Sequence, residues 1–309
     1  MKISFVIPCY RSEKTIAAVV DEIRSVVATR DGVDYEIIMV NDQSPDNVYQ
    51  VIEKMCADDP AHLKGIELAR NFGQQAALMA GYSFATGDVV FSLDDDGQSP
   101  VDAIYKLLDR LFDGADVVVG SYASKKHSVF RNFGSEMNSL MAQWLLGKPR
   151  NVQLTSFFVM RRFVLDALLT YKGPFPYLGG LLFRVTRNIV NVEVCHRERM
   201  SGTSGYSFSK LLGLWLNGFT AFSVKPLRLA SWAGFVCAMI GFLYGSWTVV
   251  NKLFLHPQVL IGYSSLMSAI LFIGGIIMLI LGLIGEYVGR IYICMNNSPQ
   301  YVISRKTGR

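Results

Sequence analysis

Residues 34–55 read DYEIIMVNDQSPDNVYQVIEKM. A β-branched run, Tyr35 to Val40, is followed by the polar residues Asn41 to Ser44 and then by an amphipathic stretch. A short apolar run bounded by polar residues is typical of a buried strand, and an amphipathic stretch is typical of a helix that packs on a sheet. The segment therefore predicts one strand, one loop and one helix of an α/β protein.

The same alternation extends from residue 1 to about residue 122. The other β-branched runs are Ile3 to Ile7, Gly65 to Leu68, Asp88 to Leu93 and Asp116 to Val119. This pattern predicts a Rossmann-like, mainly parallel sheet with helices on both faces, which binds ligands at the carboxyl ends of its strands. Polar clusters stand at those points: Pro8-Cys9-Tyr10, Asn41 to Ser44, Ala69-Arg70-Asn71 and Asp94-Asp95-Asp96.

The composition separates the chain into a polar and an apolar part. Of its 309 residues, 51% are hydrophobic and 18% are charged, and the mean hydropathy is +0.29. Two charge-free stretches, residues 229–251 and 253–285, each exceed the ~20 residues that span a bilayer. They predict a transmembrane hairpin at 229–290, with spans at about 229–251 and 259–285. A wholly soluble, two-domain cytosolic enzyme is therefore not expected.

The remaining boundaries follow from this hairpin. Residues 1–206 form the predicted catalytic domain, and residues 291–309 form a cytoplasmic tail. Residues 207–228 carry Leu, Trp and Phe together with Lys210, Lys225 and Arg228. This composition predicts amphipathic helices in the membrane interface, although a core helix of the first domain would have the same pattern.

Basic residues predict the orientation. The loop between the spans holds one lysine, Lys252, whereas Arg290, Arg305, Lys306 and Arg309 follow the second span. By the positive-inside rule both flanks are cytoplasmic, which makes the chain a multi-pass protein of the inner (plasma) membrane. The apolar run before Pro8 is too short for a signal peptide. Five scattered cysteines without a CxxC pair indicate neither a disulfide framework nor a zinc site.

The sharpest chemical signal is FSLDDDGQSP, residues 91–100, in which an apolar run ends in three carboxylates. Residues i and i+2 of an extended segment point the same way, so Asp94 and Asp96 are expected to face one site while Asp95 points away. Two converging carboxylates suit Mg²⁺ or Mn²⁺ bound to a substrate diphosphate. Alternatively, the cluster caps a helix that begins near Ser99-Pro100.

Other nucleotide motifs are missing from the sequence. It contains neither a GxGxxG after a strand nor a GxxxxGK[ST], which excludes the usual dinucleotide fold and the P-loop. A formal net charge of +5 is modest, and several basic residues flank the predicted spans, so nucleic acid is not an expected partner. The carboxylate pair without these glycine loops indicates an enzyme that uses a metal to hold a nucleoside diphosphate.

Five motifs together resemble one family: VIPCYRSEKTI, VNDQSPD, ARNFGQQAAL, SLDDDGQSP and the late LIGEYVGRIY. They are similar to those of the family 2 polyprenyl-phosphate glycosyltransferases of GT-A fold, which include bactoprenol glucosyltransferases, dolichyl-phosphate mannose synthase and undecaprenyl-phosphate aminoarabinose transferase. The resemblance covers essentially the whole chain, and it implies transfer of a sugar from a nucleotide sugar, with uracil the favoured base, to a polyprenyl (undecaprenyl) phosphate.

The resemblance also implies roles for matching residues. Asp94 and Asp96 match the metal-binding DxD, and Asp42 matches the acid that contacts the donor's base. Arg199, Gly202 and Ser204 match the turn near the diphosphate. The other residues assigned to nucleotide-sugar binding are Pro8, Tyr10, Glu13, Arg70, Gly73, Asp95 and Gln98.

Four departures from the family pattern bear on the function. Arg11 stands where Asn is usual, and Gln43 stands where Gly is usual. No acidic residue occurs in residues 151–155, and Gly205 replaces a frequent Lys. These differences make the recognised sugar and a protein general base open questions.

The expected acceptor suggests why a base is dispensable. A phosphate monoester has a second pKa near ~6, so it is mostly anionic at neutral pH and can attack the anomeric carbon itself. Direct displacement inverts the configuration, with Asp94, Asp96 and Arg199 as the expected catalytic residues. Lys125, Lys126 and Arg131 are candidates to hold the acceptor phosphate, or are surface charges near anionic lipid.

Two other functions stay open. A synthase or transferase acting on another membrane acceptor would share the fold, although such synthases usually carry QxxRW and more spans. A membrane scaffold that binds sugar nucleotides with weak or no turnover is the non-enzymatic alternative. Relatives also suggest self-association into a homo-oligomer.

Overall fold

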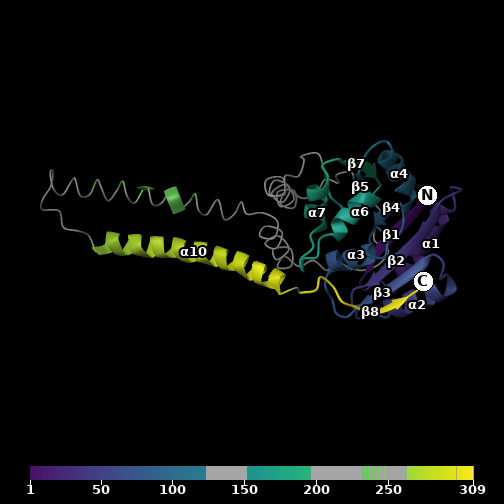
Figure 1. Cartoon of the computed structure of the whole chain (residues 1–309), viewed down its shortest axis with the longest axis horizontal. Coiled ribbons are helices and arrows are strands. Elements are labelled where there is room, and N and C mark those ends of the chain that lie inside the picture. The colour runs from purple at the N-terminus through teal and green to yellow at the C-terminus, as the bar shows by residue number, and fades with distance from the viewer. Residues whose placement is uncertain are drawn as a thin grey trace. The chain divides into compact units, whose positions relative to one another are not determined.

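The computed structural model describes residues 1–122, 152–195, 263–296 and 298–308, together with single helical positions between 232 and 247. The chain divides into two compact units. Unit 1 consists of Met1–Phe208 and Asn297–Arg309, and unit 2 consists of Ser209–Asn296. Figure 1 shows the strands gathered in unit 1 and the long helix α10 in unit 2.

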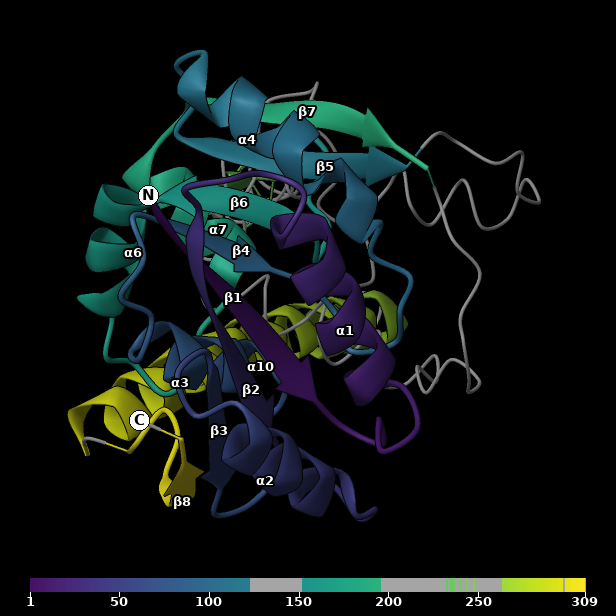
Figure 2. The same cartoon turned by 90° about the vertical axis from the view of Figure 1, so that its right-hand side faces the viewer.

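Unit 1 is built on an eight-stranded sheet with the order β7-β5-β6-β4-β1-β2-β3-β8 (Figure 2). The strands are β1 Lys2–Cys9, β2 Asp34–Asn41, β3 Leu63–Leu68, β4 Val89–Ser92, β5 Val117–Tyr122, β6 Phe158–Arg161, β7 Ile189–Val194 and β8 Ile303–Thr307. Neighbours β1–β2, β1–β4, β2–β3 and β5–β7 are parallel. The pairs β3–β8, β4–β6 and β5–β6 are antiparallel. The predicted mainly parallel sheet is confirmed.

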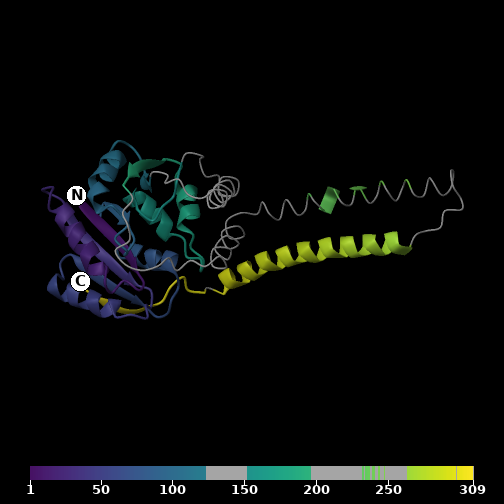
Figure 3. The same ribbon diagram turned by 180° about the vertical axis from the view of Figure 1, so that it is seen from behind.

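The helices of unit 1 cover the sheet because the strands alternate between two apolar faces. Those within the described residues are α1 Ile16–Val27, α2 Val48–Asp58, α3 Gln74–Tyr82, the 3₁₀ turn η1 Val101–Ala103, α4 Ile104–Phe112, α6 Arg162–Leu169 and α7 Leu178–Val185. Phe5 and Met39 belong to the core cluster shared with α1, α2 and α4. On the other face, Val6 and Val40 lie against Gly81 of α3. Figure 3 shows unit 1 from the opposite side to Figure 1.

The five strands predicted from residues 1–122 correspond to β1 to β5. Strands β6, β7 and β8 were not predicted. The last of these lies in the segment that the sequence suggested only as a tail. Strand β8 pairs antiparallel with β3, with Gly65 opposite Thr307 and Glu67 opposite Arg305. The end of the chain therefore belongs to the sheet of unit 1.

Unit 2 contains the helix α10, Tyr263–Met295. Its segment Phe272–Met295 is long and apolar enough to cross a membrane, with a mean hydropathy of 2.0. Large apolar side chains on it are exposed, among them Phe272 and Met278. The helix coincides with most of the span predicted at 259–285. The span predicted at 229–251 falls largely outside the described residues. Its described positions are helical, and the large apolar side chains among them, such as Trp232 and Leu243, are exposed.

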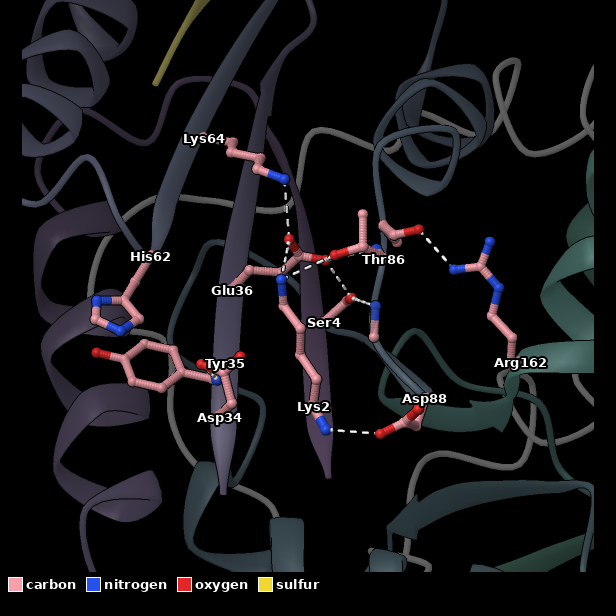
Figure 4. A network of polar contacts seen from close by, with 12 residues as sticks. Lys2, Ser4, Asp34, Tyr35, Glu36, His62, Lys64, Thr86, Asp88 and Arg162 are labelled. Atoms are coloured by element: carbon pink, nitrogen blue, oxygen red, sulfur yellow. Dashed lines mark hydrogen bonds and ion pairs between the residues drawn. The ribbon is translucent and has the colours of Figure 1, made fainter. Parts of the chain in front are cut away.

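A buried carboxylate ties together the strand ends opposite the predicted ligand site (Figure 4). Glu36 accepts hydrogen bonds from Ser4 Oγ at 2.6 Å and from the Thr86 N–H at 2.6 Å, and it pairs with Lys64 Nζ at 2.9 Å and Lys2 Nζ at 3.1 Å. Burial alone would raise the pKa of Glu36, but these donors lower it to about 2. The ionised form therefore stabilises the fold.

Candidate functional site

The polar residues predicted to mark the site follow β1, β2, β3 and β4 at one edge of the sheet. Cys9 is paired with Asn41, and Asn41 is paired with Glu67, so the ends of the first three strands are in register. Since these strands are parallel, the loops that leave them emerge on the same side. The loops carry Tyr10, Asp42, Arg70 and the acidic triplet 94–96.

Asp94 is held by two side chains that the sequence analysis did not single out. Gln74 Nε2, at the start of α3, donates to Asp94 Oδ1 at 2.7 Å. Ser156 Oγ, just before β6, donates to Asp94 Oδ2. The two donors are 82 positions apart in the sequence, and only the pairing of β4 with β6 brings Ser156 to the triplet. Both oxygens of this carboxylate are therefore oriented by protein groups.

Asp95 faces the other way. Its Oδ2 accepts a hydrogen bond from the Tyr10 N–H at 2.9 Å, which links it to the loop after β1. Burial raises the pKa of Asp95 to about 6, and the negative charge of Asp94 also raises it. Asp95 thus holds the loop after β1 through the backbone of Tyr10, whereas Tyr10 itself is 44% exposed.

Asp96 and Asp94 both act electrostatically on Tyr122. Burial raises the pKa of Tyr122 to about 12, and the charges of both Asp94 and Asp96 contribute to this increase. Both carboxylates therefore lie close enough to act on the same phenol at the end of β5. The backbone turns directly afterwards, because Gly97 has a φ of 74° and the Gln98 N–H donates to Asp96 Oδ1 at 3.0 Å.

Asp42 joins the loops after β2 and β3. Its two carboxylate oxygens accept hydrogen bonds from the N–H groups of Phe72 at 2.7 Å and Gly73 at 2.8 Å. Burial raises the pKa of Asp42, although both donors act against this. Gly73 has a φ of 89° and directly precedes α3. Arg70 is exposed, with its guanidinium 4.5 Å from the centre of the Phe72 ring.

Glu13 joins the loops after β1 and β2. Its carboxylate accepts the N–H of Asn47 at 3.3 Å, and its own N–H donates to Asp46 Oδ2 at 3.0 Å. Ser44 Oγ accepts the Arg11 N–H at 2.7 Å and donates to Asp46 Oδ1 at 2.5 Å. The two loops therefore form one hydrogen-bonded layer beside the acidic triplet.

Two residues of this layer have left-handed backbones. Arg11 has a φ of 59° and Gln43 a φ of 48°. These are the positions where the family pattern has Asn and Gly, the two residue types that adopt this conformation most readily. Arg11 and Gln43 therefore hold a backbone conformation that their side chains disfavour.

The acidic triplet suits a divalent cation in part. Among the residues that the structure describes, no group of three or more His, Cys, Asp or Glu side chains could hold a metal. Asp94 and Asp96 supply two hard oxygen ligands, and Mg²⁺ in enzymes is commonly held by one or two carboxylates plus substrate phosphates. The donor set therefore fits a cation that arrives with a diphosphate.

Several predicted site residues lie outside the described ranges. They are Arg199, Gly202, Ser204, Lys125, Lys126 and Arg131. Pro8, the remaining predicted residue, lies in β1 opposite Val40. The described part of the candidate site thus contains Gln74 and Ser156, added by the structure, together with the predicted residues Pro8, Tyr10, Glu13, Asp42, Arg70, Gly73, Asp94, Asp95, Asp96 and Gln98.

Two family models match this sequence. The model described as glycosyl transferase family 2 matches residues 4–169, and the model described as GtrB C-terminal hairpin matches residues 225–291. The first covers the loops of the candidate site, and the second covers both stretches predicted to span a membrane. The two halves of the chain are therefore each similar to a known unit.

Similar proteins extend over nearly the whole chain. An undecaprenyl-phosphate 4-deoxy-4-formamido-L-arabinose transferase of Klebsiella pneumoniae is 33% identical over 305 residues, which is 98% of this chain and 93% of the relative. A bactoprenol glucosyl transferase of Shigella phage SfII is 32% identical over 312 residues, 99% of this chain and 98% of the relative.

Among solved structures, the glucosyl-3-phosphoglycerate synthase from Mycobacterium tuberculosis in complex with Mn²⁺ and uridine-diphosphate-glucose superposes with a TM-score of 0.52. The match has 18% identity and covers 71% of this chain and 77% of that one. This likeness confirms the predicted fold.

Proposed function

The chain belongs to glycosyl transferase family 2, and on this basis we propose that it moves a sugar from a nucleotide sugar to a polyprenyl phosphate. The observation that carries the proposal is the similarity over the full length to transferases named for such lipid acceptors, through the catalytic part and the hairpin alike. The product is a lipid-linked monosaccharide, a form suited to modification of cell-envelope glycans.

The donor is proposed to be a uridine diphosphate sugar that lies over the loops after β1, β2 and β3. Asp94 and Asp96 would hold Mg²⁺ or Mn²⁺ on its diphosphate, and the cation would supply positive charge against the leaving nucleoside diphosphate. Gln74 and Ser156 fix the orientation of Asp94, and Asp95 fixes the first loop. Such positioning lowers the barrier because the groups need no reorganisation during reaction.

The acceptor phosphate is proposed as the nucleophile. As a dianion it needs no protein base, so the missing acidic residue in 151–155 does not preclude reaction. Attack opposite the leaving group inverts the anomeric configuration. Arg199 is proposed to stabilise the leaving diphosphate, and Lys125, Lys126 and Arg131 to bind the acceptor phosphate.

The membrane part is proposed to bring the acceptor to the enzyme. The stretches 229–251 and 259–285 would span the inner membrane as a hairpin, with the catalytic unit cytoplasmic and residues 207–228 in the interface. The apolar, exposed surface of α10 supports this arrangement. Self-association into a homo-oligomer is also part of the proposal.

Incubation of the purified full chain with an undecaprenyl phosphate and a panel of nucleotide sugars tests the function. Mass spectrometry should reveal a glycosylated lipid phosphate with Mg²⁺ or Mn²⁺ and none with a chelator. Asp96→Ala should lower the rate at least ~100-fold, the scale at which electrostatic groups act on the transition state. Asp113→Asn, an exposed aspartate after α4, is the matched control. Full turnover by Asp96→Ala, or donor binding without transfer by the unchanged chain, would contradict the proposal.

A further inference from the structure

We propose that the C-terminal strand β8 positions the loop after β2 through a row of polar side chains that crosses the end of the sheet. The row runs from Arg305 in β8 through Glu67 in β3 to Asn41 in β2. That the positioned loop serves a nucleotide sugar rests on the function proposed above. The row itself rests on contacts within unit 1.

Strand register places the three residues side by side. Asn41 is the partner of Glu67 in the parallel pair β2–β3, and Glu67 is the partner of Arg305 in the antiparallel pair β3–β8. Directly paired residues have side chains on the same face of a sheet, close enough to interact. The three side chains therefore meet at the edge from which the site loops emerge.

Polar contacts connect the row. Arg305 Nε lies 3.0 Å from Glu67 Oε2, and Asn41 Nδ2 donates to Glu67 Oε1 at 3.1 Å. Each carboxylate oxygen of Glu67 thus has its own partner, one from each neighbouring strand. Ser304 Oγ also donates to the Glu67 carbonyl oxygen at 3.1 Å. The C-terminal strand is bound to Glu67 by a charged and a neutral contact.

The row ends in the loop after β2. Asn41 Oδ1 accepts the Ser44 N–H at 3.0 Å, so the amide of Asn41 uses its donor toward Glu67 and its acceptor toward the loop. Ser44 in turn binds the Arg11 N–H and Asp46. A displacement of Glu67 would therefore reorient the amide of Asn41 and release Ser44, the residue that joins the first two site loops.

Two of the three side chains in the row are buried, so loss of a contact between them should be costly. Asn41 is 2% exposed, and the Glu67 side chain is 10% exposed, whereas Arg305 is 63% exposed. A buried amide or carboxylate that loses its partner is destabilised more than an exposed one, because water does not replace the lost hydrogen bond. The exposed Arg305 supplies a positive charge that holds the Glu67 carboxylate, and Glu67 in turn holds the amide of Asn41.

Strand β8 comes late in the sequence, so the row connects the loop after β2 with a segment that follows the candidate membrane helix. Strand β8 follows α10 after a connection of seven residues, 296–302. The segment that returns from the candidate membrane helix therefore completes the sheet at β3 and orients a site loop formed more than 250 residues earlier. Arg305, Glu67 and Asn41 are positioning residues, since none of them is assigned a contact with substrate.

Three variants of the full chain test the proposal. Arg305→Gln removes the charge, Arg305→Lys retains it, and Lys306→Gln is the matched control because the Lys306 ammonium lies over the Phe84 ring, 4.6 Å from its centre, and not in the row. Glu67→Leu removes the acceptor of the Asn41 amide. It disrupts the row more strongly, in case the effect of Arg305→Gln on exchange and KM is small. The readouts are hydrogen exchange of peptides covering residues 41–48 and the KM and kcat for the nucleotide sugar.

Arg305→Gln is expected to speed exchange of the 41–48 amides and to raise KM about threefold with kcat within twofold of the unaltered chain. Glu67→Leu should raise KM about tenfold, as expected for a lost hydrogen bond to a charged group. Arg305→Lys should recover most of the effect, and Lys306→Gln should show none. Unchanged exchange and KM in Glu67→Leu would overturn the proposal. If the unaltered chain fails to use a nucleotide sugar while exchange still responds, the proposed function fails and the positioning row stands.

Discussion

Asp94 and Asp95 are adjacent in the sequence, but their carboxylates accept hydrogen bonds from different parts of the molecule. Gln74 Nε2 donates to Asp94 at 2.7 Å, and the Tyr10 N–H donates to Asp95 at 2.9 Å. Strand β4 ends at Ser92, and Asp95 lies in the turn that follows, so this turn directs two neighbouring carboxylates to different partners. Asp95 holds the first loop, whereas the charges of Asp94 and Asp96 both raise the pKa of Tyr122.

The donors that orient Asp94 should affect metal use. Gln74→Ala or Ser156→Ala is expected to raise the Mg²⁺ or Mn²⁺ concentration for half-maximal transfer about tenfold, since groups that orient a metal ligand typically contribute 10–100-fold. Metal titration of the transfer rate measures this. Gln75→Ala is the matched control, because Gln75 Oε1 accepts the Leu178 N–H instead. An unaltered metal requirement in both variants would show that Asp94 needs no such support.

The left-handed backbones at Arg11 and Gln43 predict two stabilising substitutions. Gln43→Gly and Arg11→Asn should each raise the free energy of unfolding by about 0.5–1 kcal/mol, because the left-handed conformation disfavours side chains other than Gly and Asn. Thermal melting in detergent is the measurement. Gln43→Ala, which retains a Cβ at the same φ, should give no such gain. Equal stability of the Gly and Ala variants would argue against backbone strain.

The Glu36 network predicts a pH-dependent contribution to stability. The pKa of Glu36 is about 2 in the folded chain, below its ordinary 4.5, so the ionised form stabilises the fold above pH 4.5 and this contribution is lost as the pH falls toward 2. Glu36→Gln should therefore lower the free energy of unfolding by roughly 3 kcal/mol at pH 7, and the difference should shrink below pH 4.5. Denaturation at pH 7, 4 and 3 measures it.

Glu53→Gln, on α2 and outside this network, is the control for the pH series. A difference between Glu36→Gln and the unaltered chain that stayed constant from pH 7 to pH 3 would mean that the charge of Glu36 is not responsible. Because the network lies opposite the candidate site, KM for the nucleotide sugar should not change in Glu36→Gln.

Helix α3 packs closely on the sheet at Gly81, so a methyl group added at this position should lower the stability of the fold. A Cβ at Gly81 would clash with Val6 Cγ1 and would lie 3.0 Å from Val40 Cγ2. Gly81→Ala should lower the free energy of unfolding by about 1–3 kcal/mol, as overpacking commonly does. Adding Val6→Ala should recover part of this loss because it removes the nearest methyl group. A double variant less stable than the sum of both single changes would contradict this account.

Local pattern was enough to predict the first five strands. In β1 and β2 every other residue faces the core shared with α1, α2 and α4, so hydrophobic periodicity and strand length carry the information. The acidic triplet was predictable for the same reason, because its residues follow a buried strand. The antiparallel strand β6 and the strand β7, which is parallel to β5, lie beyond that regular alternation, where no repeated unit marks them.

Ser156, Gln74 and β8 could not be predicted in their roles. The segment ISRKT of β8 is mostly polar, and it becomes a strand because the edge of β3 offers unpaired backbone groups. Ser156 reaches Asp94 only through the antiparallel pairing of β4 with β6. In both cases, Ser156 with Asp94 and β8 with β3, the two interacting parts are far apart in the sequence.

The amino-acid order alone determined the alternating core of this protein, its two long charge-free apolar stretches and the carboxylates after one strand, because each depends on residues that are near neighbours in the chain. Folding in three dimensions decided which distant groups surround those carboxylates and that the last strand joins the sheet beside Glu67. Hydrogen bonds between remote strands have no local pattern, since their geometry exists only once the strands are paired.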